Sequence, residues 1–411
     1  MQSISEKDRE RLRFLARKQL ELAHSPENDR IIRQYEALGQ GRREAPTVRL
    51  LFSNFMDEVV YNRMECTHPE ARKMECQLLA TMVGRELFGD DTPISPTFDV
   101  SWNTWVNPFG TAPKLEYNRE SGGFRIVKQF EELPDGMELL RGGGFGADRE
   151  GTLGWIETVE EVLGDLLPCR MVMGSLPGMI TNPLVQLMGM ENYYLAMYDY
   201  EEELHQVMDM ATEIYEQYYD FLEREKLLCP TWGLSPINQE SFAFNHELPS
   251  DRVTRTIECW GFMEGQETHA VSPEMFGEFL YPYQDRMNRH FGLLTYGCCE
   301  RVDAIWEDYL SKWKNLRKLS VSPFNDERRV GDYLRGTNVV YYSKPRAEFV
   351  TDRSGLDEAA LRSYFKEVCT CASGCLFEMA QREVGTIYGD YERGRRYVEI
   401  AKECVQEYWK P

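Results

Sequence analysis

The sequence lacks the features of a membrane protein or an exported protein. None of its 411 residues falls in an uninterrupted apolar run of about 18, the length that a membrane-spanning helix needs. Its first residues, Met1-Gln2-Ser3-Ile4, lead into a charged segment and lack the apolar stretch of a signal peptide. We therefore expect a cytoplasmic protein with no membrane span.

An excess of basic residues is also missing. Lys and Arg number 47 against 68 Asp and Glu, which gives a formal net charge of -21. A surface of this sign repels phosphate backbones and anionic lipid, so no nucleic-acid or membrane-surface partner is expected. The 11 cysteines, without a secretion signal, are expected to be reduced thiols or metal ligands rather than a disulfide framework.

Phosphate-binding motifs are absent as well. The glycine cluster Gly142–Gly146 lacks the Lys-Ser/Thr pair of a P-loop and the strand-turn-helix frame of a dinucleotide site. A flexible loop is the favoured interpretation of this cluster. An open doubly wound sheet would carry such a phosphate turn after an early strand, and its absence argues against that fold.

Strand and helix patterns alternate along most of the chain. Amphipathic helices are predicted over 6–24, 28–38 and 69–88, and we assign 1–90 to an N-terminal helical extension. Strands are predicted over 171–175, 229–234, 257–262, 291–295, 316–321, 338–342 and 375–380, with helical segments between them. This alternation implies parallel strands, so we predict an α/β fold in which 91–411 form a (β/α)8 TIM barrel.

The run Tyr296-Gly297-Cys298-Cys299-Glu300 directly follows the predicted strand 291–295. The carboxyl ends of barrel strands carry the active site, so the two thiols are expected there. Neighbouring side chains on a pleated strand point to opposite faces, so both can bind one metal only if the strand has ended, and Gly297 permits that break. The alternative is that both cysteines are small buried core residues.

Further candidate metal ligands lie after another predicted strand. Glu267 and His269 follow the strand 257–262, so we predict a zinc site made of Cys298, Cys299, Glu267 and His269. A loop histidine and a substrate-orienting carboxylate are the alternative interpretations of the last two. Cys375 begins its strand and is expected at the opposite end of the barrel, in a packing role.

Other polar and aromatic residues suit catalysis or substrate binding. The predicted catalytic residues are Glu240, Tyr296 and Arg382, and the predicted substrate-binding residues are Asn238, Trp102, Trp105 and Tyr342. The alternatives are an ordinary polar loop at 238–240, a structural ion pair for Arg382 and core packing for the aromatic residues.

Five stretches of the chain together resemble the uroporphyrinogen decarboxylase-like superfamily, and its corrinoid-linked methyltransferase branch in particular. They are Trp260 with Gln266-Glu267-Thr268, Val271-Ser272-Pro273-Glu274-Met275-Phe276, Tyr296-Gly297-Cys298-Cys299-Glu300, Leu316-Arg317-Lys318-Leu319-Ser320-Val321-Ser322-Pro323 and Ser343-Lys344-Pro345. The resemblance implies a single (β/α)8 barrel with N-terminal helical additions, with Cys298 in the position of the family's zinc thiol.

The sequence departs from the family in two places. The Arg-Gln-Ala-Gly-Arg stretch that genuine uroporphyrinogen decarboxylases use for a polyanionic porphyrinogen is absent, so a role in haem synthesis is not expected. Tyr296 stands where the coenzyme M methyltransferases have a zinc-binding histidine. The family's zinc ligands therefore do not transfer as a complete set.

The leading hypothesis is a zinc-dependent methyltransferase that moves a methyl group between a small methylated substrate and the cobalt of a separate corrinoid protein. The chain has no Asp-x-His-x-x-Gly motif, so the corrinoid (cobalamin) must come from that partner. An aromatic content of 12% favours a methoxylated aromatic donor, as in O-demethylation. The alternatives are a cofactor-independent decarboxylase and a non-catalytic corrinoid-binding module, and the oligomeric state is left open.

Overall fold

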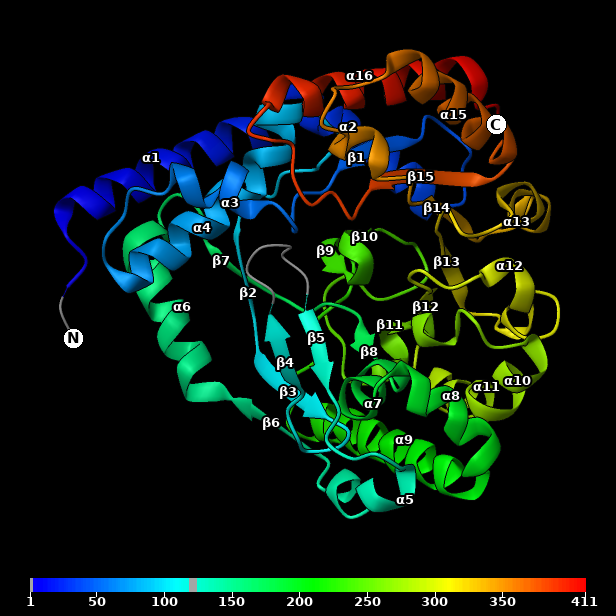
Figure 1. Ribbon diagram of the computed structural model, residues 1–411. Helices are drawn as coiled ribbons and strands as arrows, with labels where there is room; N and C mark the ends of the chain where they lie inside the picture. The colour runs from blue at the N-terminus through cyan, green and yellow to red at the C-terminus, as the bar shows by residue number, and fades with distance from the viewer. Residues whose placement is uncertain (1–2, 118–123) are drawn as a thin grey trace.

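Seven parallel strands form a curved sheet around the centre of the molecule (Figure 1), in the computed structural model that describes residues 3–117 and 124–411. Their order is β1-β15-β14-β13-β12-β11-β8. The bounds are β1 Thr47–Leu50, β8 Leu176–Pro177, β11 Trp260–Met263, β12 Leu293–Tyr296, β13 Leu316–Val321, β14 Val340–Ser343 and β15 Leu376–Gln381. The predicted α/β class with parallel strands is confirmed.

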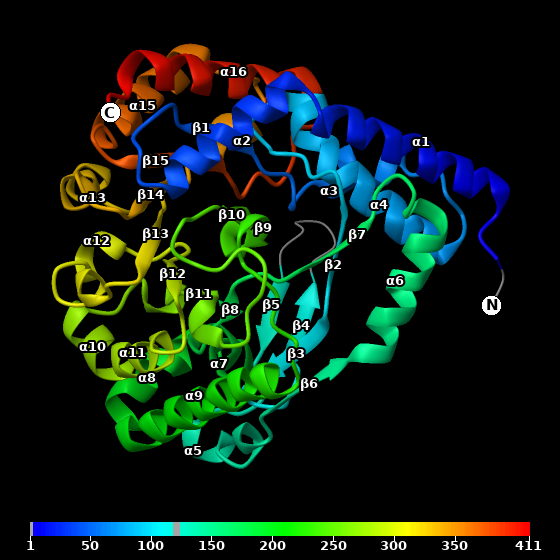
Figure 2. The same ribbon diagram turned by 180° about the vertical axis from the view of Figure 1, so that it is seen from behind.

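The helices that follow β11 to β15 lie outside the sheet (Figures 1 and 2). They are α10 Pro273–Phe279, α11 Tyr281–Asn288, α12 Val302–Ile305, α13 Glu327–Leu334, α14 Glu348–Thr351, α15 Glu358–Cys371 and α16 Tyr391–Tyr408. With helices on one side and the enclosed centre on the other, β11, β12 and β14 are buried at every position. Burial on both faces explains why these strands read as continuous apolar runs.

A separate parallel pair, β2 Phe98–Ser101 with β7 Cys169–Val172, lies beside the sheet. The chain passes from β7 directly into β8. The parallel strands β1, β2, β7, β8 and β11 to β15 therefore succeed one another along the chain in the order expected for a barrel. In the described part of the chain, however, no backbone ladder joins β1 to β2. The backbone N–H groups of Val48 and Leu50 instead donate to the carboxylates of Asp91 (2.9 Å) and Asp90 (3.1 Å).

The N-terminal segment packs across this open side. Its helices are α1 Glu6–Ala23, α2 Pro26–Gly39, α3 Met56–Val59 and α4 Pro69–Val83. The hydroxyls of Ser5 and Ser25 cap the first two helices. The predicted extension 1–90 also contains strand β1, which pairs with β15 at the other end of the chain. The domain boundary at residue 90 stays a prediction.

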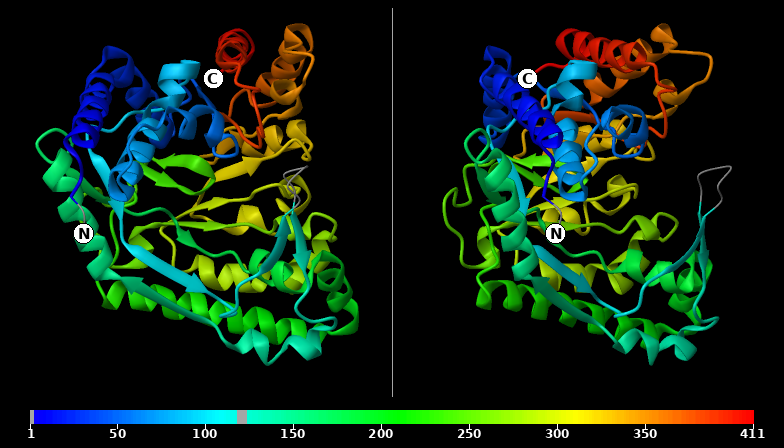
Figure 3. Two further views of the ribbon diagram at one scale, coloured as in Figure 1. Left: turned by 60° about the vertical axis from the view of Figure 1, so that its left-hand side comes forward. Right: turned by 90° about the vertical axis from the view of Figure 1, so that its left-hand side faces the viewer.

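An inserted segment between β2 and β7 contains two antiparallel pairs (Figure 3). They are β3 Asn103–Asn107 with β6 Gly144–Asp148, and β4 Lys114–Tyr117 with β5 Phe124–Val127; α5 Leu133–Gly136 and α6 Arg149–Leu163 complete the insertion. The flexible-loop interpretation of the glycine cluster was therefore wrong for Gly144–Gly146. A Cβ on Gly146 would lie 2.9 Å from the Trp105 indole nitrogen, so the glycine leaves room for that ring.

Three helices, α7 Thr181–Met188, α8 Met190–Asp199 and α9 Glu201–Arg224, lead from β8 to the segment that we predicted as a barrel strand over 229–234. That prediction was wrong. The segment forms an antiparallel hairpin, β9 Gly233–Ile237 with β10 Ser241–Ala243, which lies in the space that the parallel strands partly enclose (Figure 1). No helix in the described residues is long and apolar enough to span a bilayer.

Buried charges hold the hairpin in this place. The Lys318 ammonium on β13 donates to the Glu378 carboxylate on β15 (2.9 Å), to the carbonyl of Phe242 (3.0 Å) and to the Ser241 hydroxyl. The Arg49 guanidinium on β1 lies 3.9 Å from Glu378 and 4.8 Å from the centre of the Phe242 ring. Three barrel strands and the hairpin therefore share one ionic cluster.

Replacement Glu378→Gln should destabilise the fold strongly, because it leaves Lys318 and Arg49 buried without their counter-charge. We expect a loss of about 3–5 kcal/mol in the free energy of unfolding, measured by urea denaturation. The matched control is Glu138→Gln, which removes an exposed ion pair with Arg141 and should cost less than about 1 kcal/mol. Equal midpoints for the two variants would contradict a structural role for the cluster.

Candidate functional site

Polar side chains gather at the carboxyl edge of the sheet, where each parallel strand ends. Glu264 follows β11, Cys298 and Cys299 follow β12, Lys344 follows β14 and Arg382 follows β15. The tip of the β9–β10 hairpin meets this edge from the centre. The arrangement is the one in which parallel α/β barrels hold their active sites.

Gly297 produces the turn that brings the two thiols together. Strand β12 ends at Tyr296, and Gly297 takes a φ of 100°, which L side chains rarely adopt. Its N–H donates to the carbonyl of Met263 at 2.9 Å, which fixes the turn against β11. Cys298 and Cys299 consequently lie beyond the pleat, with their Sγ atoms 3.8 Å apart. The predicted strand break is confirmed.

The Glu300 carboxylate holds this thiol turn in place. It accepts hydrogen bonds from the N–H of Cys298 (2.6 Å) and from the N–H of Gly265 (2.8 Å). Burial raises the pKa of Glu300, while the backbone N–H groups favour its ionised form. Glu300 therefore joins the loop after β11 to the loop after β12, a role that sequence reasoning missed.

The two thiols differ in acidity. A hydrogen bond from Cys298, assisted by the Lys344 ammonium, lowers the pKa of Cys299 to about 7. The same hydrogen bond, together with burial, raises the pKa of Cys298. Lys344 also donates to the Cys298 carbonyl, so its charge is close to both. The hydrogen bond between the thiols and the Lys344 ammonium therefore favour the thiolate form of Cys299.

Glu264 completes this acidic cluster and was not among the predicted ligands. It is buried, and burial first, then the charges of Glu300 and Cys298, raises its pKa to about 10. Unless a metal ion binds beside it, Glu264 stays protonated at neutral pH. The sequence held one signal for a site role of Glu264: it is the first polar residue after the apolar run 260–263.

Among the described residues, the two predicted ligands after β11 do not join the thiols in a group that could hold a metal. Both carboxylate oxygens of Glu267 are taken, by the Thr181 hydroxyl (2.7 Å) and the Asn182 amide (2.8 Å) on α7. His269 is exposed, and its ring meets the edge of Phe324 at 5.4 Å. Glu267 thus binds α7, a role that we did not predict, and His269 has the loop position that we weighed as its alternative.

The hairpin tip brings several predicted residues to the site. Gln239 and Glu240 have φ angles of 64° and 56°, a costly conformation for residues other than glycine. The Gln239 side chain accepts hydrogen bonds from Lys344 (3.2 Å) and Arg382, and its carbonyl accepts one from the Tyr342 hydroxyl (2.6 Å). Because Tyr342 is itself buried in β14, its hydrogen bond fixes the hairpin tip in position.

The remaining polar candidates near the tip are already paired. Arg382 lies 3.7 Å from Glu240 and 3.9 Å from Glu383, the ion pairing that we weighed as its alternative role. The Asn238 backbone N–H donates to the Ser175 hydroxyl (3.1 Å), which in turn donates to the Asn238 side chain. These contacts fix the loop 238–240 to β15 on one side and to the chain after β7 on the other.

The predicted aromatic residues do not converge on the thiols. Tyr296 is fully buried, its ring packs on Trp313 at 5.5 Å, and burial raises its pKa well above the usual value. Trp102 lines a separate cavity of about 240 Å³ beside β7 and α9. Trp105 is 54% exposed on β3. Tyr296 is therefore buried behind the residues that line the site and is not exposed to it.

A cavity of about 300 Å³ opens beside Cys299. Its lining residues are Cys299, Ser322, Pro323, Phe324, Lys344, Pro345, Arg346, Ala347, Glu348, Arg382 and Glu383. Three of these side chains are cationic and two are anionic, and Phe324 presents an aromatic ring that is 60% exposed. The cavity can therefore hold a small molecule with a flat apolar part and a negative group.

The donor atoms fit a thiophilic metal in part. Zinc–thiolate bonds of about 2.3 Å in a tetrahedron place two sulfurs about 3.8 Å apart, and the two thiols already have that separation. The carboxyl group of Glu264, close to Cys298, would supply a third donor atom. Across residues 3–117 and 124–411, no group of three or more His, Cys, Asp or Glu side chains is arranged so that it could hold a metal ion. Complete coordination of a zinc ion would require the Glu264 side chain to rotate toward the thiols, or a further ligand from a bound molecule.

Comparison with solved structures supports the fold. A methyltransferase from Methanosarcina mazei aligns over 91% of this chain and 98% of its own, with a TM-score of 0.51 and 14% identity. A B12-independent methionine synthase from Shewanella sp. W3-18-1 in complex with selenomethionine aligns over 74% and 76%, at 10% identity, with a TM-score of 0.32 that supports no inference. No protein-family model and no curated protein sequence matches the chain.

The reactivity of Cys299 should reveal its low pKa. In protein treated with chelator, its alkylation by iodoacetamide should rise with pH through a midpoint of about 7, because only the thiolate reacts. Replacement Lys344→Met should move that midpoint upward, since the ammonium favours the thiolate. Peptide mass spectrometry over a pH series measures both.

The matched control is Lys366→Met, which removes an exposed lysine on α15 and should leave the midpoint unchanged. Alkylation of Cys298 at lower pH than Cys299 would contradict the preference for the Cys299 thiolate.

Proposed function

We propose that this protein is a zinc-dependent methyltransferase that moves a methyl group between a small methylated substrate and the cobalt of a corrinoid carried by a separate protein. The observation that carries the proposal is the thiol pair after β12, whose sulfurs are 3.8 Å apart beside the buried carboxyl group of Glu264. A methyltransferase of the same fold is consistent with it.

Cys298 and Cys299 would hold the metal, with Glu264 as a third ligand. Zinc bound there would supply a Lewis acid that polarises the oxygen or sulfur to which the methyl group is attached. A divalent cation would also offset the repulsion among Glu264, Glu300 and the thiols, which otherwise keeps protons on two of them. Binding should accordingly release protons from Cys298 and Glu264.

The hairpin tip would orient the substrate. Gln239 is held by Lys344, Arg382 and Tyr342, so its side chain and that of Glu240 are fixed relative to the thiol turn. Arg382 and Glu240 then carry the polar contacts that we predicted for catalysis, with Arg382 able to turn from its ion pair toward an anionic group. Trp102, Trp105 and Tyr296 are not part of this proposal.

The cavity beside Cys299 suits a methoxylated aromatic substrate. Phe324 offers a ring for stacking, while Lys344, Arg346 and Arg382 offer positive charge. The loops after Cys299, Pro323 and Pro345 all line this cavity, so they would form the mouth at which a corrinoid protein docks transiently. The methyl group must pass through that mouth to reach the cobalt.

Zinc content tests the metal site directly. We expect about one zinc per chain by elemental analysis, its loss in Cys298→Ala and Cys299→Ala, and at least tenfold weaker binding in Glu264→Gln. The matched control is Cys375→Ala: this thiol is buried before β15, at the opposite end of the strands, and donates to the carbonyl of Gly331. Zinc lost equally from the control, or absent from the unaltered protein, would contradict the proposal.

Methyl transfer is tested by mixing the protein with corrinoid carriers reduced to Co(I) and a panel of methoxylated aromatic compounds, methylamines and methyl thiols. We expect conversion of the cobalt spectrum to methyl-Co(III) with at least one donor, and its loss in Cys298→Ala. Release of carbon dioxide from an aromatic acid, with no change at cobalt, would favour the decarboxylase instead. Binding of a corrinoid carrier without turnover would favour a non-catalytic module.

A further inference from the structure

The thiol turn holds two adjacent cysteines in a geometry that a regular strand does not give. On a pleated strand the side chains of Cys298 and Cys299 would point to opposite faces. After the turn at Gly297 their Sγ atoms instead lie 3.8 Å apart, and both side chains are partly exposed. A disulfide bond of about 2.0 Å then requires an approach of less than about 2 Å between the sulfurs.

Hydrogen bonds fix the backbone on both sides of this pair. The Glu300 carboxylate accepts from the Cys298 N–H at 2.6 Å, and the Lys344 ammonium donates to the Cys298 carbonyl. The Ser322 hydroxyl donates to the Cys299 carbonyl at 3.2 Å. These contacts hold the two thiols side by side without a metal between them.

The cavity of about 300 Å³ at the carboxyl edge reaches one thiol of the pair. Cys299 lines this cavity together with Lys344, whereas Cys298 is not among the lining residues. A small electrophile that enters the cavity therefore meets the Cys299 sulfur first. The Cys298 sulfur is then the neighbouring thiol that can react with the product.

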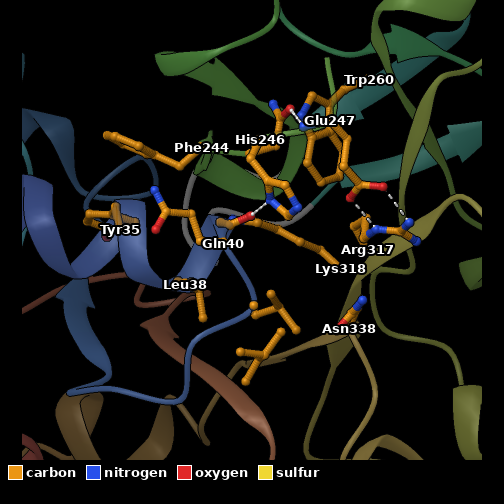
Figure 4. Close-up of a pocket in the computed structure, with 15 residues that line it drawn as sticks. Tyr35, Leu38, Gln40, Phe244, His246, Glu247, Trp260, Arg317, Lys318 and Asn338 are labelled. Carbon is orange, nitrogen blue, oxygen red and sulfur yellow. Dashed lines mark hydrogen bonds and ion pairs between the residues drawn. The ribbon is translucent and has the colours of Figure 1, made fainter.

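Two other cavities do not present such a pair. The cavity of about 110 Å³ between α2 and the amino ends of the parallel strands has no cysteine among its described lining residues (Figure 4). The cavity of about 510 Å³ beside α13 and α15 is lined by a single cysteine, Cys371, whose side chain is only 5% exposed. A small oxidant should therefore react preferentially at the thiol turn.

We propose that Cys298 and Cys299 are an oxidative modification site, at which a hydroperoxide converts the two thiols to a reversible disulfide. The Cys299 thiolate attacks the hydroperoxide: an S–O bond forms, the O–O bond breaks, and the leaving oxygen takes up the proton that Cys299 released. The Cys298 sulfur then attacks the Cys299 sulfur; the S–S bond forms, and hydroxide leaves with the Cys298 proton as water. The thiols lose two electrons and the hydroperoxide gains them.

The disulfide should be strained and therefore easily reduced. Neighbouring Cα atoms across a trans peptide bond are about 3.8 Å apart, whereas those of a disulfide are usually about 4.4–6.8 Å apart. The hydrogen bonds of Glu300 and Lys344 to the Cys298 backbone oppose any movement that would relieve this strain. Strained disulfides have more oxidising potentials, so small thiols such as glutathione restore the pair. The inference rests neither on the proposed methyl transfer nor on bound zinc.

Mass spectrometry of the full-length protein tests the modification. Reduced protein in a chelator is treated with hydrogen peroxide, blocked with N-ethylmaleimide and digested with trypsin without reduction. The peptide 290–301, which contains both cysteines, should be lighter by two hydrogens and carry no maleimide. An excess of reduced glutathione should restore both maleimide-reactive thiols. Because the chelator removes metal, failure of the zinc proposal would leave this result unchanged.

Single replacements separate the roles of the two thiols. In Cys298→Ser, oxidation should stop at the Cys299 sulfenic acid, which dimedone labels. In Cys299→Ser, dimedone labelling of Cys298 should be at least tenfold slower, because Cys298 does not line the cavity. The matched control is Cys76→Ser, which removes a partly exposed thiol on α4 and should form the disulfide like the unaltered protein.

Three results would each overturn the inference. The first is two maleimides on the peptide 290–301 after peroxide treatment, or a disulfide from this peptide to another cysteine. The second is a bond that persists in an excess of reduced glutathione. The third is dimedone labelling of Cys299→Ser that is as fast as that of Cys298→Ser.

Discussion

The ion pair of Lys318 with Glu378, joined by Arg49, is the constraint on which the functional architecture depends. These side chains point inward from three parallel strands, where a barrel would normally be filled by apolar residues. Here they bind the Phe242 carbonyl and the Ser241 hydroxyl of the β9–β10 hairpin, polar groups that would be costly to bury without partners. The centre of the barrel thus becomes a support for the loop 238–240 at the active edge.

A second constraint acts at the thiol turn. Gly297 allows the chain to leave β12 sharply, and Glu300 binds the N–H groups of two successive loops. The thiols are thereby placed by backbone geometry, not by long side chains of their own. The cost is a group of acidic residues in close contact, which a cation would offset and which Lys344 offsets in part.

Local patterns in the sequence were sufficient for most of the fold. The alternation of strands and helices after residue 257 predicted β11 to β15 closely, and the step from Tyr296 to Gly297 predicted the end of β12. The segment 229–234 misled us because its apolar run is equally typical of a barrel strand and of a buried hairpin. Only the inward charges on β1, β13 and β15, far apart in the chain, distinguish the two.

Site residues were harder to predict for the same reason. Position after a strand directed us to the thiols and Arg382, which lie at the carboxyl edge, whereas Glu240 reaches that edge from the hairpin tip. It could not separate Glu264 from Glu267, three residues apart, because the choice depends on which one the Thr181 and Asn182 side chains on α7 engage. Nor could it reveal that Tyr342 binds the Gln239 carbonyl, since the hairpin itself was not foreseen.

The aspartates that face β1 have a consequence for association between molecules. A parallel sheet that stops at β1 would present a row of unpaired N–H groups, which other chains can extend by adding a strand. Asp91 and Asp90 accept those of Val48 and Leu50, and Asp91 is itself held by Arg30 and Lys402. Negative side chains thus take the place of the missing strand, so the N–H groups of Val48 and Leu50 are not free to pair with a strand from another chain.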